Sequence, residues 1–275
     1  VGGSASASDL VMVKPWQKNH QSAGIFRSGN AGVKWINGAD GARGVRGESM
    51  VIDPTNPQIL YVATMRGVFK STDGGVTWAA SSKGMTVATA QYIAIDPKTP
   101  TNLYVATSSG GLFRSKDGGE SWAPFGEIGV RAFTLAALGD KVFAGTENGV
   151  YSADAASGAW TKLGLEGSKV YSLAIDPNIG PNGTMLIAGT DSGIRVTRNS
   201  GQDWSSIDLG GSEESLSVAI ASYSGSAGSK KIGVMIGSGT TAHYGSTGIT
   251  ALSVEQGAAK ATQSAPAAIN AKVGL

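Results

Sequence analysis

The sequence predicts an all-β protein built from a repeated unit of four short strands. Composition is the first observation behind this prediction. Of the 275 residues, 41 are Gly and only 15% are charged, which favours short strands and tight turns over long surface helices. The second observation is a series of tryptophans spaced by 43, 44, 38 and 44 residues: Trp35, Trp78, Trp122, Trp160 and Trp204. A regular period of this length indicates a repeat protein.

Two further series of residues keep the same phase. One is a short apolar run that ends in Thr or Ser, and its copies begin at Tyr61, Tyr104, Phe143, Ile187 and Met235. The other is Ile-Asp-Pro, which begins at Ile52, Ile95 and Ile175, with spacings of 43 and then 80, or two periods. Three series in one phase indicate that the repeat is structural.

A single period divides into four strands. Residues 49–53 form the first, which ends before Pro54 because proline cannot donate to a ladder. Residues 59–64 are β-branched and apolar, so we expect a second strand buried on both faces. Residues 68–71 and 76–80 supply the third and fourth, on either side of an Asp-Gly-Gly turn. Four strands in about 43 residues are typical of a β-propeller blade.

The number of blades follows from the period. Five units occupy residues 47–85, 88–126, 130–164, 168–209 and 213–254. Residues 25–28 and 33–37 supply the outer hairpin of an earlier unit, and residues 10–13 supply an inner strand. Six blades are therefore predicted, with seven as the alternative.

The predicted domain organisation has three parts. Residues 1–9 are a Gly/Ser/Ala-rich flexible leader, residues 10–255 the propeller, and residues 256–275 an Ala-rich tail. Residues 267–273 of the tail are a candidate strand that closes the ring or joins a second copy, because closure protects edges that would otherwise aggregate. A solvated linker is the alternative for the tail.

The turn between the third and fourth strands carries a motif. Residues 71–78 and 115–122 both read Ser-x-Asp-x-Gly-x-Ser/Thr-Trp, with degenerate copies at 28–35 and 197–204 and a copy lengthened by one residue at 152–160. This motif resembles the Asp-box of the BNR-repeat β-propellers, and the resemblance covers about residues 24–254. That family includes sialidases, xyloglucan-cleaving glycosidases, sortilin-type receptors and photosystem assembly factors. The resemblance implies that the box turns lie on the outer rim, away from the central face.

The residue types of the motif have a structural explanation without catalysis. An Asp or Asn side chain accepts hydrogen bonds from the amides of its own turn, and Gly adopts the positive φ that other residues disfavour. We expect the Trp to cover the space between neighbouring blades. A structural role is therefore predicted for Asp73, Trp78, Asp117, Trp122, Asn199 and Trp204, and also for Asn30 and Asp154.

Candidate ligand-binding residues lie elsewhere in each unit. In a propeller, the loops that enter the first strands and those between the second and third strands meet at one face. The charged and titratable residues predicted there are Arg46, Glu48, Arg66, Arg131, Glu147, Asp191 and His243. Arg43, Met65, Gln91, Ser108, Asn148 and Tyr171 occupy similar positions.

These residues leave two kinds of enzyme to consider. A sialidase needs arginines that converge on a substrate carboxylate, and Arg46, Arg66 and Arg131 are the candidates, although residues 26–28 depart from the Arg-Ile-Pro signature of that family. A glycosidase needs two carboxylates about 5 to 10 Å apart, which could come from Glu48, Glu147 and Asp191. The xyloglucan-cleaving relatives use two propellers facing a cleft, in much longer chains.

Several other functions are disfavoured by composition. The chain has no Cys and only two His, and contains no metal-binding or phosphate-loop motif, so neither a metal nor a cofactor is predicted. A net charge of +2 does not favour nucleic-acid binding, and no apolar run is long enough to cross a membrane.

The prediction is therefore an exported, non-catalytic propeller that acts as a cell-surface or extracellular binding or scaffold protein. Its expected partner is a protein or glycan on the central face, with self-assembly through the termini as a further expectation. The start at Val1 fits removal of an export signal. A glycoside hydrolase with its site on the central face is the alternative function.

Overall fold

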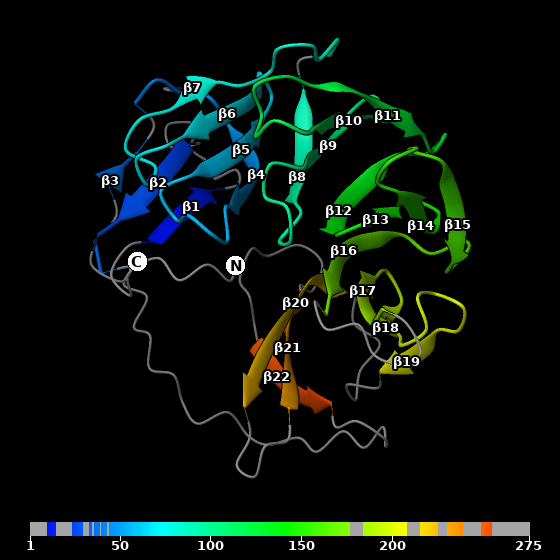
Figure 1. Cartoon of the computed structure of the whole chain (residues 1–275). Helices are drawn as coiled ribbons and strands as arrows, with labels where there is room; N and C mark the ends of the chain where they lie inside the picture. The colour runs from blue at the N-terminus through cyan, green and yellow to red at the C-terminus, as the bar shows by residue number, and fades with distance from the viewer. Residues whose placement is uncertain are drawn as a thin grey trace. The chain divides into compact units, whose positions relative to one another are not determined.

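The computed structural model describes residues 10–14, 24–29, 33–34, 36–38, 40–42, 44–87, 89–176, 184–207, 215–224, 230–238 and 249–254. All regular structure in these ranges is β-strand, and every pairing is antiparallel between strands adjacent in the chain (Figure 1). The all-β prediction is confirmed. The chain divides into two compact units, residues 1–170 and 171–275, which are described separately.

The first unit contains four sheets. A three-stranded sheet comprises β1 (Leu10–Lys14), β2 (Gly24–Ser28) and β3 (Ile36–Asn37). The next comprises β4 (Gly47–Ile52), β5 (Leu60–Thr64), β6 (Gly67–Ser71) and β7 (Ala79–Ala80). It is followed by β8 (Ala90–Ile95), β9 (Leu103–Thr107), β10 (Gly111–Ser115) and β11 (Ala123–Glu127). The last comprises β12 (Ala132–Leu138), β13 (Lys141–Thr146), β14 (Gly149–Asp154) and β15 (Trp160–Gly164).

The second unit contains two sheets. Four strands form the first: β16 (Val170–Ile175), β17 (Leu186–Thr190), β18 (Gly193–Thr197) and β19 (Ser205–Ile207). The other comprises β20 (Ser215–Ser224), β21 (Lys230–Ser238) and β22 (Ile249–Val254). The predicted strands at residues 216–221 and 232–238 lie within β20 and β21. The number of blades in the complete chain stays a prediction, and the predicted leader and tail lie outside the described residues.

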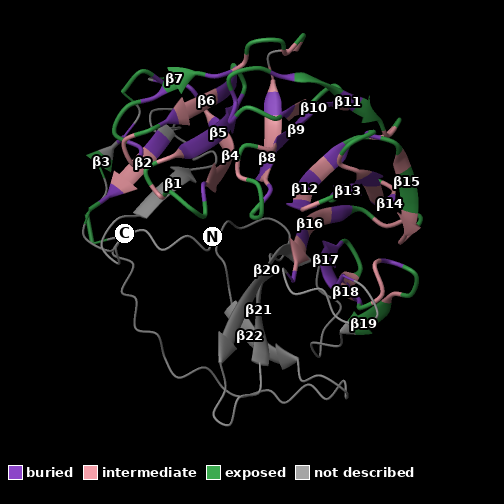
Figure 2. Ribbon diagram, in the orientation of Figure 1, coloured by how far each residue is buried: buried purple, intermediate pink, exposed green. Residues whose placement is uncertain are grey.

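Burial follows the order of the strands within each sheet. Every residue of β5, β9 and β17 is buried (Figure 2), which confirms the expectation of a doubly buried second strand at residues 59–64. The first strands of neighbouring sheets pack side by side in the first unit, β4 against β8 and β8 against β12. The core of this unit therefore lies between consecutive sheets, as apolar second strands require.

Two predicted strands are shorter in the structure. Of residues 33–37, β3 contains only Ile36 and Asn37. Residues 76–80 were expected to pair along their length, but β7 contains only Ala79 and Ala80. The amides of Val76 and Thr77 donate to the Asp73 carboxylate, and the Trp78 amide donates to the Asp40 carbonyl at 2.8 Å. The turn therefore extends further along the chain than the strand pattern indicated, because these amides already have partners.

No helix among the described residues is long and apolar enough to cross a membrane.

Candidate ligand-binding site

The turn between the second and third strands is anchored by a buried threonine in four sheets. Its hydroxyl donates to the carbonyl of the glycine that starts the third strand, at 2.7 to 3.0 Å. The four pairs are Thr64 with Gly67, Thr107 with Gly111, Thr146 with Gly149, and Thr190 with Gly193. We call the strand ends that these turns connect the loop end of the sheets. The motif turns connect the opposite strand ends, which we call the box end.

One of these turns is longer than the others. Two residues separate the threonine from the glycine in three sheets, but Ser108, Ser109 and Gly110 lie between Thr107 and Gly111. Gly110 has a φ of +85° and nothing within 4 Å of where a Cβ would stand. The added residue therefore opens space at the loop end beside β9 and β10.

A hollow of about 600 Å³ lies beside this longer turn. Its walls come from four connections: the β7–β8 connection, the β9–β10 turn, the β11–β12 connection and Glu147 in the β13–β14 turn. Leu112, Phe113 and Pro124 contribute apolar surface, and Glu127, Arg131 and Glu147 contribute charge. We call it the Arg131 hollow. A cavity of this size is in the range of ligand sites.

Arg131 is exposed but its guanidinium is held in place. Its Nε and Nη2 donate to Gln91 Oε1 at 3.3 and 3.0 Å. The guanidinium carbon also lies 5.4 Å from the centre of the Phe133 ring, which gives a cation–π contact. Because its orientation is already fixed, Arg131 loses little freedom when a ligand binds beside it.

Neither glutamate of the Arg131 hollow has a side-chain partner among the described residues that holds its carboxylate in place. Glu147 is tied to Arg131 through the backbone, and its carboxylate accepts a long hydrogen bond of 3.4 Å from the Arg131 amide. Glu127 ends β11, and its carboxylate has no hydrogen bond or ion pair with another described residue. Both side chains are exposed.

The remaining predicted ligand-face residues do not join this hollow. Arg46 pairs with Glu48 at 2.9 Å, and Arg66 is exposed in the β5–β6 turn, where its amide donates to Thr64. Asp191 belongs to the β17–β18 turn of the second unit. His243, Arg43 and Asn30 lie outside the described residues.

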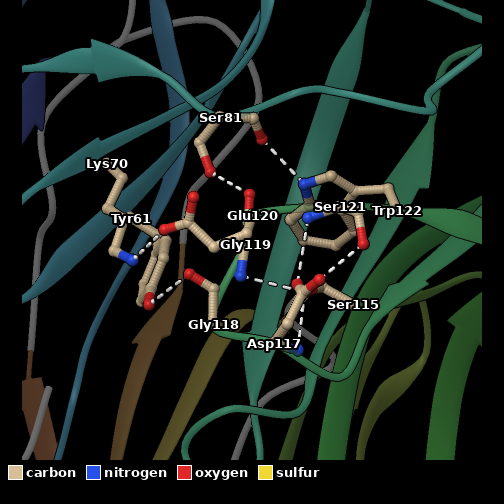
Figure 3. A network of polar contacts seen from close by, with 10 residues as sticks. All are labelled: Tyr61, Lys70, Ser81, Ser115, Asp117, Gly118, Gly119, Glu120, Ser121 and Trp122. Carbon is tan, nitrogen blue, oxygen red and sulfur yellow. Dashed lines mark hydrogen bonds and ion pairs between the residues drawn. The ribbon is translucent and has the colours of Figure 1, made fainter.

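The box end has a different architecture, which Figure 3 shows for one turn. Asp117 accepts hydrogen bonds from the amide and hydroxyl of Ser121 and from the hydroxyl of Ser115. These bonds lower the pKa of Asp117 to about 2. Asp73 has the equivalent bonds from Thr77 and Ser71. Desolvation opposes them, but its pKa is also lowered to about 2.

Each motif tryptophan that the structure describes in the first unit reaches the preceding sheet. Its indole N–H donates to a backbone carbonyl there: Trp78 to Gly38, Trp122 to Ser81 and Trp160 to Phe125, at 2.7 to 3.0 Å. Trp78 and Trp122 are 4% exposed. The carbonyl of an outer strand or of the loop beside it thus receives a donor from the next sheet, which leaves less of each sheet edge open to other chains.

Tyr61 adds a second link between neighbouring sheets. Its hydroxyl donates to the Gly118 carbonyl at 2.9 Å, and Lys70 pairs with Glu120 at 3.0 Å (Figure 3). Burial, followed by the nearby carboxylates of Asp53, Glu120 and Asp117, raises the pKa of Tyr61 to about 12. The tyrosine therefore stays a hydrogen-bond donor well into alkaline solution.

The degenerate motif of the second unit exchanges donor and acceptor. Asn199 stands where the others have Asp, and its amide group donates to Asp203 at 2.9 Å while its oxygen accepts from the Asp203 amide at 3.0 Å. Gly201 and Thr197 keep the remaining bond of the turn. Trp204 is half-buried. An amide and a carboxylate here replace the carboxylate and hydroxyl of the first unit.

Comparison with known proteins gives structural but not sequence relatives. No family model and no curated protein matches the chain. An ancestral GH74 enzyme superposes with a TM-score of 0.64 and 18% identity, over 84% of this chain and 34% of its own. The extracellular domain of BT4673, a hybrid two-component system protein of B. thetaiotaomicron, gives 0.56 and 13%, over 87% and 32%.

A protein of a nidogen–laminin complex gives a TM-score of 0.55 and 10% identity, over 78% of this chain and 86% of its own. These proteins are β-propellers. The fold is a β-propeller. The chain spans about a third of the length of the GH74 and BT4673 structures, and at these identities the likeness shows the fold alone.

Glu127, which lines the Arg131 hollow, and Phe133, which contacts the Arg131 guanidinium, were not among the predicted site residues. Phe133 lies two positions after Arg131, but Arg131 precedes β12 and the pairing of β12 with β13 is irregular between Ala132 and Thr134, so a period-two pattern did not mark this contact. Glu127 stands at the end of an outer strand, where the sequence pattern marks no ligand face.

Among the residues that the structure describes, no group of three or more His, Cys, Asp or Glu could hold a metal ion.

Proposed function

We propose that this chain is a non-catalytic binding propeller, exported to the cell surface or the extracellular space, which holds a protein or glycan partner at the loop end of its sheets. The Arg131 hollow is the observation that carries the proposal. It combines a volume of about 600 Å³ with an arginine already oriented by Gln91 and Phe133. Oriented polar groups above an apolar floor are typical of ligand sites.

The structural neighbours support binding as a use of this fold. One belongs to a complex of nidogen with laminin, and another is an extracellular domain. Fold likeness alone is compatible with unrelated activities, so the proposal depends on the hollow.

Glycoside hydrolysis is the second candidate, favoured by the likeness to a GH74 enzyme. It needs two carboxylates in complementary protonation states. Glu48 already pairs with Arg46 at 2.9 Å, whereas Glu147 has no ion pair among the described residues and is the carboxylate to test first.

A screen with a blocking variant tests the proposal. The purified chain is assayed against arrays of glycans and of extracellular proteins, beside Ser108→Trp and Thr101→Trp. Ser108 is exposed at the hollow, and Thr101 is exposed at the box end. We expect a ligand that binds wild type and Thr101→Trp but not Ser108→Trp. Binding unaffected by Ser108→Trp would place the site elsewhere and contradict the proposal.

Turnover measurements address the alternative. Xyloglucan and a panel of other glycans are incubated with wild type, Glu48→Gln and Glu147→Gln, and product is measured by reducing-end release. No turnover is expected for any of them. Turnover that disappears in Glu147→Gln would overturn the non-catalytic reading.

A further inference from the structure

Ion pairing separates the glutamates of the described residues into two groups. Glu48 pairs with Arg46, Glu120 with Lys70, and Glu166 with Lys162, at 2.9 to 3.1 Å. Glu127 and Glu147 have no such pair among the described residues. Both of these line the Arg131 hollow. The two glutamates without an ion pair are thus both at the candidate site.

The one cation of the hollow is already engaged. Arg131 donates from Nε and Nη2 to Gln91 and lies over the Phe133 ring, so its side chain is turned to neutral partners. The charged lining residues are one arginine and two glutamates, which leaves a net charge of −1. The whole chain carries +2, so the hollow is acidic on a protein that is otherwise slightly basic.

We propose that the Arg131 hollow binds a basic segment of a partner polypeptide, with a lysine or arginine side chain placed between Glu127 and Glu147. This inference rests on the proposed binding function and names its partner class. The incoming cation supplies the charge that both carboxylates lack, because complementary charge selects partners at an interface.

The walls of the hollow suit a polypeptide. Gly110 and Gly129 have φ of +85° and +78°, and nothing lies within 4 Å of where their Cβ would stand. An incoming backbone can therefore approach closely. Pro124, which is exposed, offers apolar surface to the methylene stem of a lysine or arginine. The aromatic ring of the lining, Phe113, is 4% exposed and offers little face for a sugar ring.

Selection from a random heptapeptide library tests the class of partner. The library is panned in parallel on wild type, Ser108→Trp, Glu120→Gln and the double variant Glu127→Gln/Glu147→Gln. Glu120→Gln is the matched control, because it removes an exposed carboxylate at the box end. We expect Lys- and Arg-rich peptides from wild type and Glu120→Gln, and loss of that enrichment on the other two variants.

Affinities of a synthetic selected peptide then test the arrangement of charges. Each single Glu→Gln change is expected to weaken binding about three- to fivefold, the size of one exposed ion pair. Raising the salt from 50 to 500 mM should weaken wild-type binding more than that of the double variant.

The failures of the two proposals are distinguishable. The basic-segment inference would be overturned if acidic or neutral peptides bound wild type but not Ser108→Trp. Binding of an amine-bearing glucosamine oligomer in place of a peptide, with the same dependence on Ser108, would also overturn it. Either result would leave the binding function standing. Basic peptides that bind the double variant as well as wild type would also overturn the basic-segment inference. No ligand in this selection or in the glycan and protein arrays would overturn both proposals.

Discussion

At the box end of sheets β4–β7 and β8–β11, the two turns use the same residue types in the same bonds. Asp73 and Asp117 accept from a hydroxyl two positions before them and from the residue four positions after them. At the loop end, the same sheets share only the buried threonine and its bond to the glycine that starts the third strand. Met65 and Arg66 follow it in one sheet, and Ser108, Ser109 and Gly110 in the other.

This difference separates two tasks within one repeat. Residues that repeat in both type and bonding hold neighbouring sheets together, as Trp78 and Trp122 do. At the loop end, the threonine anchor stays constant while the residues after it differ between sheets. These differing residues shape one place on the surface. The Arg131 hollow lies beside the turn with an added residue, which is the turn that differs most from its counterparts in the other sheets.

The largest expected effect comes from removing a tryptophan at the box end. Trp122→Ala should lower the free energy of unfolding by about 3–5 kcal/mol, as large aromatic deletions in cores do. Trp122→Phe keeps most of the ring but loses the N–H bond to Ser81, and about 1–2 kcal/mol is expected. Urea denaturation measures both. Equal stability of Trp122→Ala and wild type would contradict the structural role of the box end.

Two glycines give the next contrast. A Cβ at Gly84 would stand 2.2 Å from the Trp122 carbonyl oxygen, with φ of +91°, so Gly84→Ala should cost roughly 3 kcal/mol. Gly129, at the loop end, has φ of +78° and open space, so Gly129→Ala should cost only about 1 kcal/mol of backbone strain. Thermal unfolding of the two variants checks this, and an equal cost would argue against the close packing at Gly84.

Acid should weaken the box end through Asp117. Its pKa is about 2 in the folded chain and 3.8 ordinarily, so the unfolded chain binds the proton first as the pH falls. The stabilisation is complete above about pH 4 and is lost as the pH drops toward 2.

Asp117→Asn provides the control, because an amide does not titrate there. The difference in unfolding free energy between wild type and this variant should be constant from pH 7 to 5 and should narrow below pH 4. A difference that stays constant to pH 2 would show that the Asp117 carboxylate is not held ionised by its turn.

The smallest expected loss of stability lies at the loop end. Thr107→Val removes a buried hydroxyl that donates to Gly111 at 3.0 Å and should cost about 1 kcal/mol. Thr64→Val should cost a similar amount, since its bond to Gly67 is equivalent. Only Thr107→Val should also weaken ligand binding at the Arg131 hollow, because the turn that follows Thr107 forms part of the wall. Equal losses of binding in both variants would remove the link between the longer turn and the site.

Much of the fold could be predicted from the sequence because its determinants are local. The spacing of the tryptophans, the buried run at Leu60–Thr64 and the Ser-x-Asp-x-Gly pattern each act within one sheet or one turn. The predicted length of β7 was wrong for two reasons: the amides of Val76 and Thr77 bond to Asp73 in the same turn, and the Trp78 amide bonds to Asp40 in the β3–β4 connection. A strand pattern contains no information on partners of that kind.

The candidate site shows the same division. By sequence, Arg131 and Glu147 were expected at one face, whereas the contact of Arg131 with Phe133 at the irregular start of β12 was not. Only the tertiary structure brings Gln91 to Arg131 from 40 residues away and leaves Glu127 and Glu147 without a cation among the described residues. The physical reason is that hydrogen-bonded strands are set by short-range periodicity, whereas the pairing of exposed charges depends on how consecutive sheets pack.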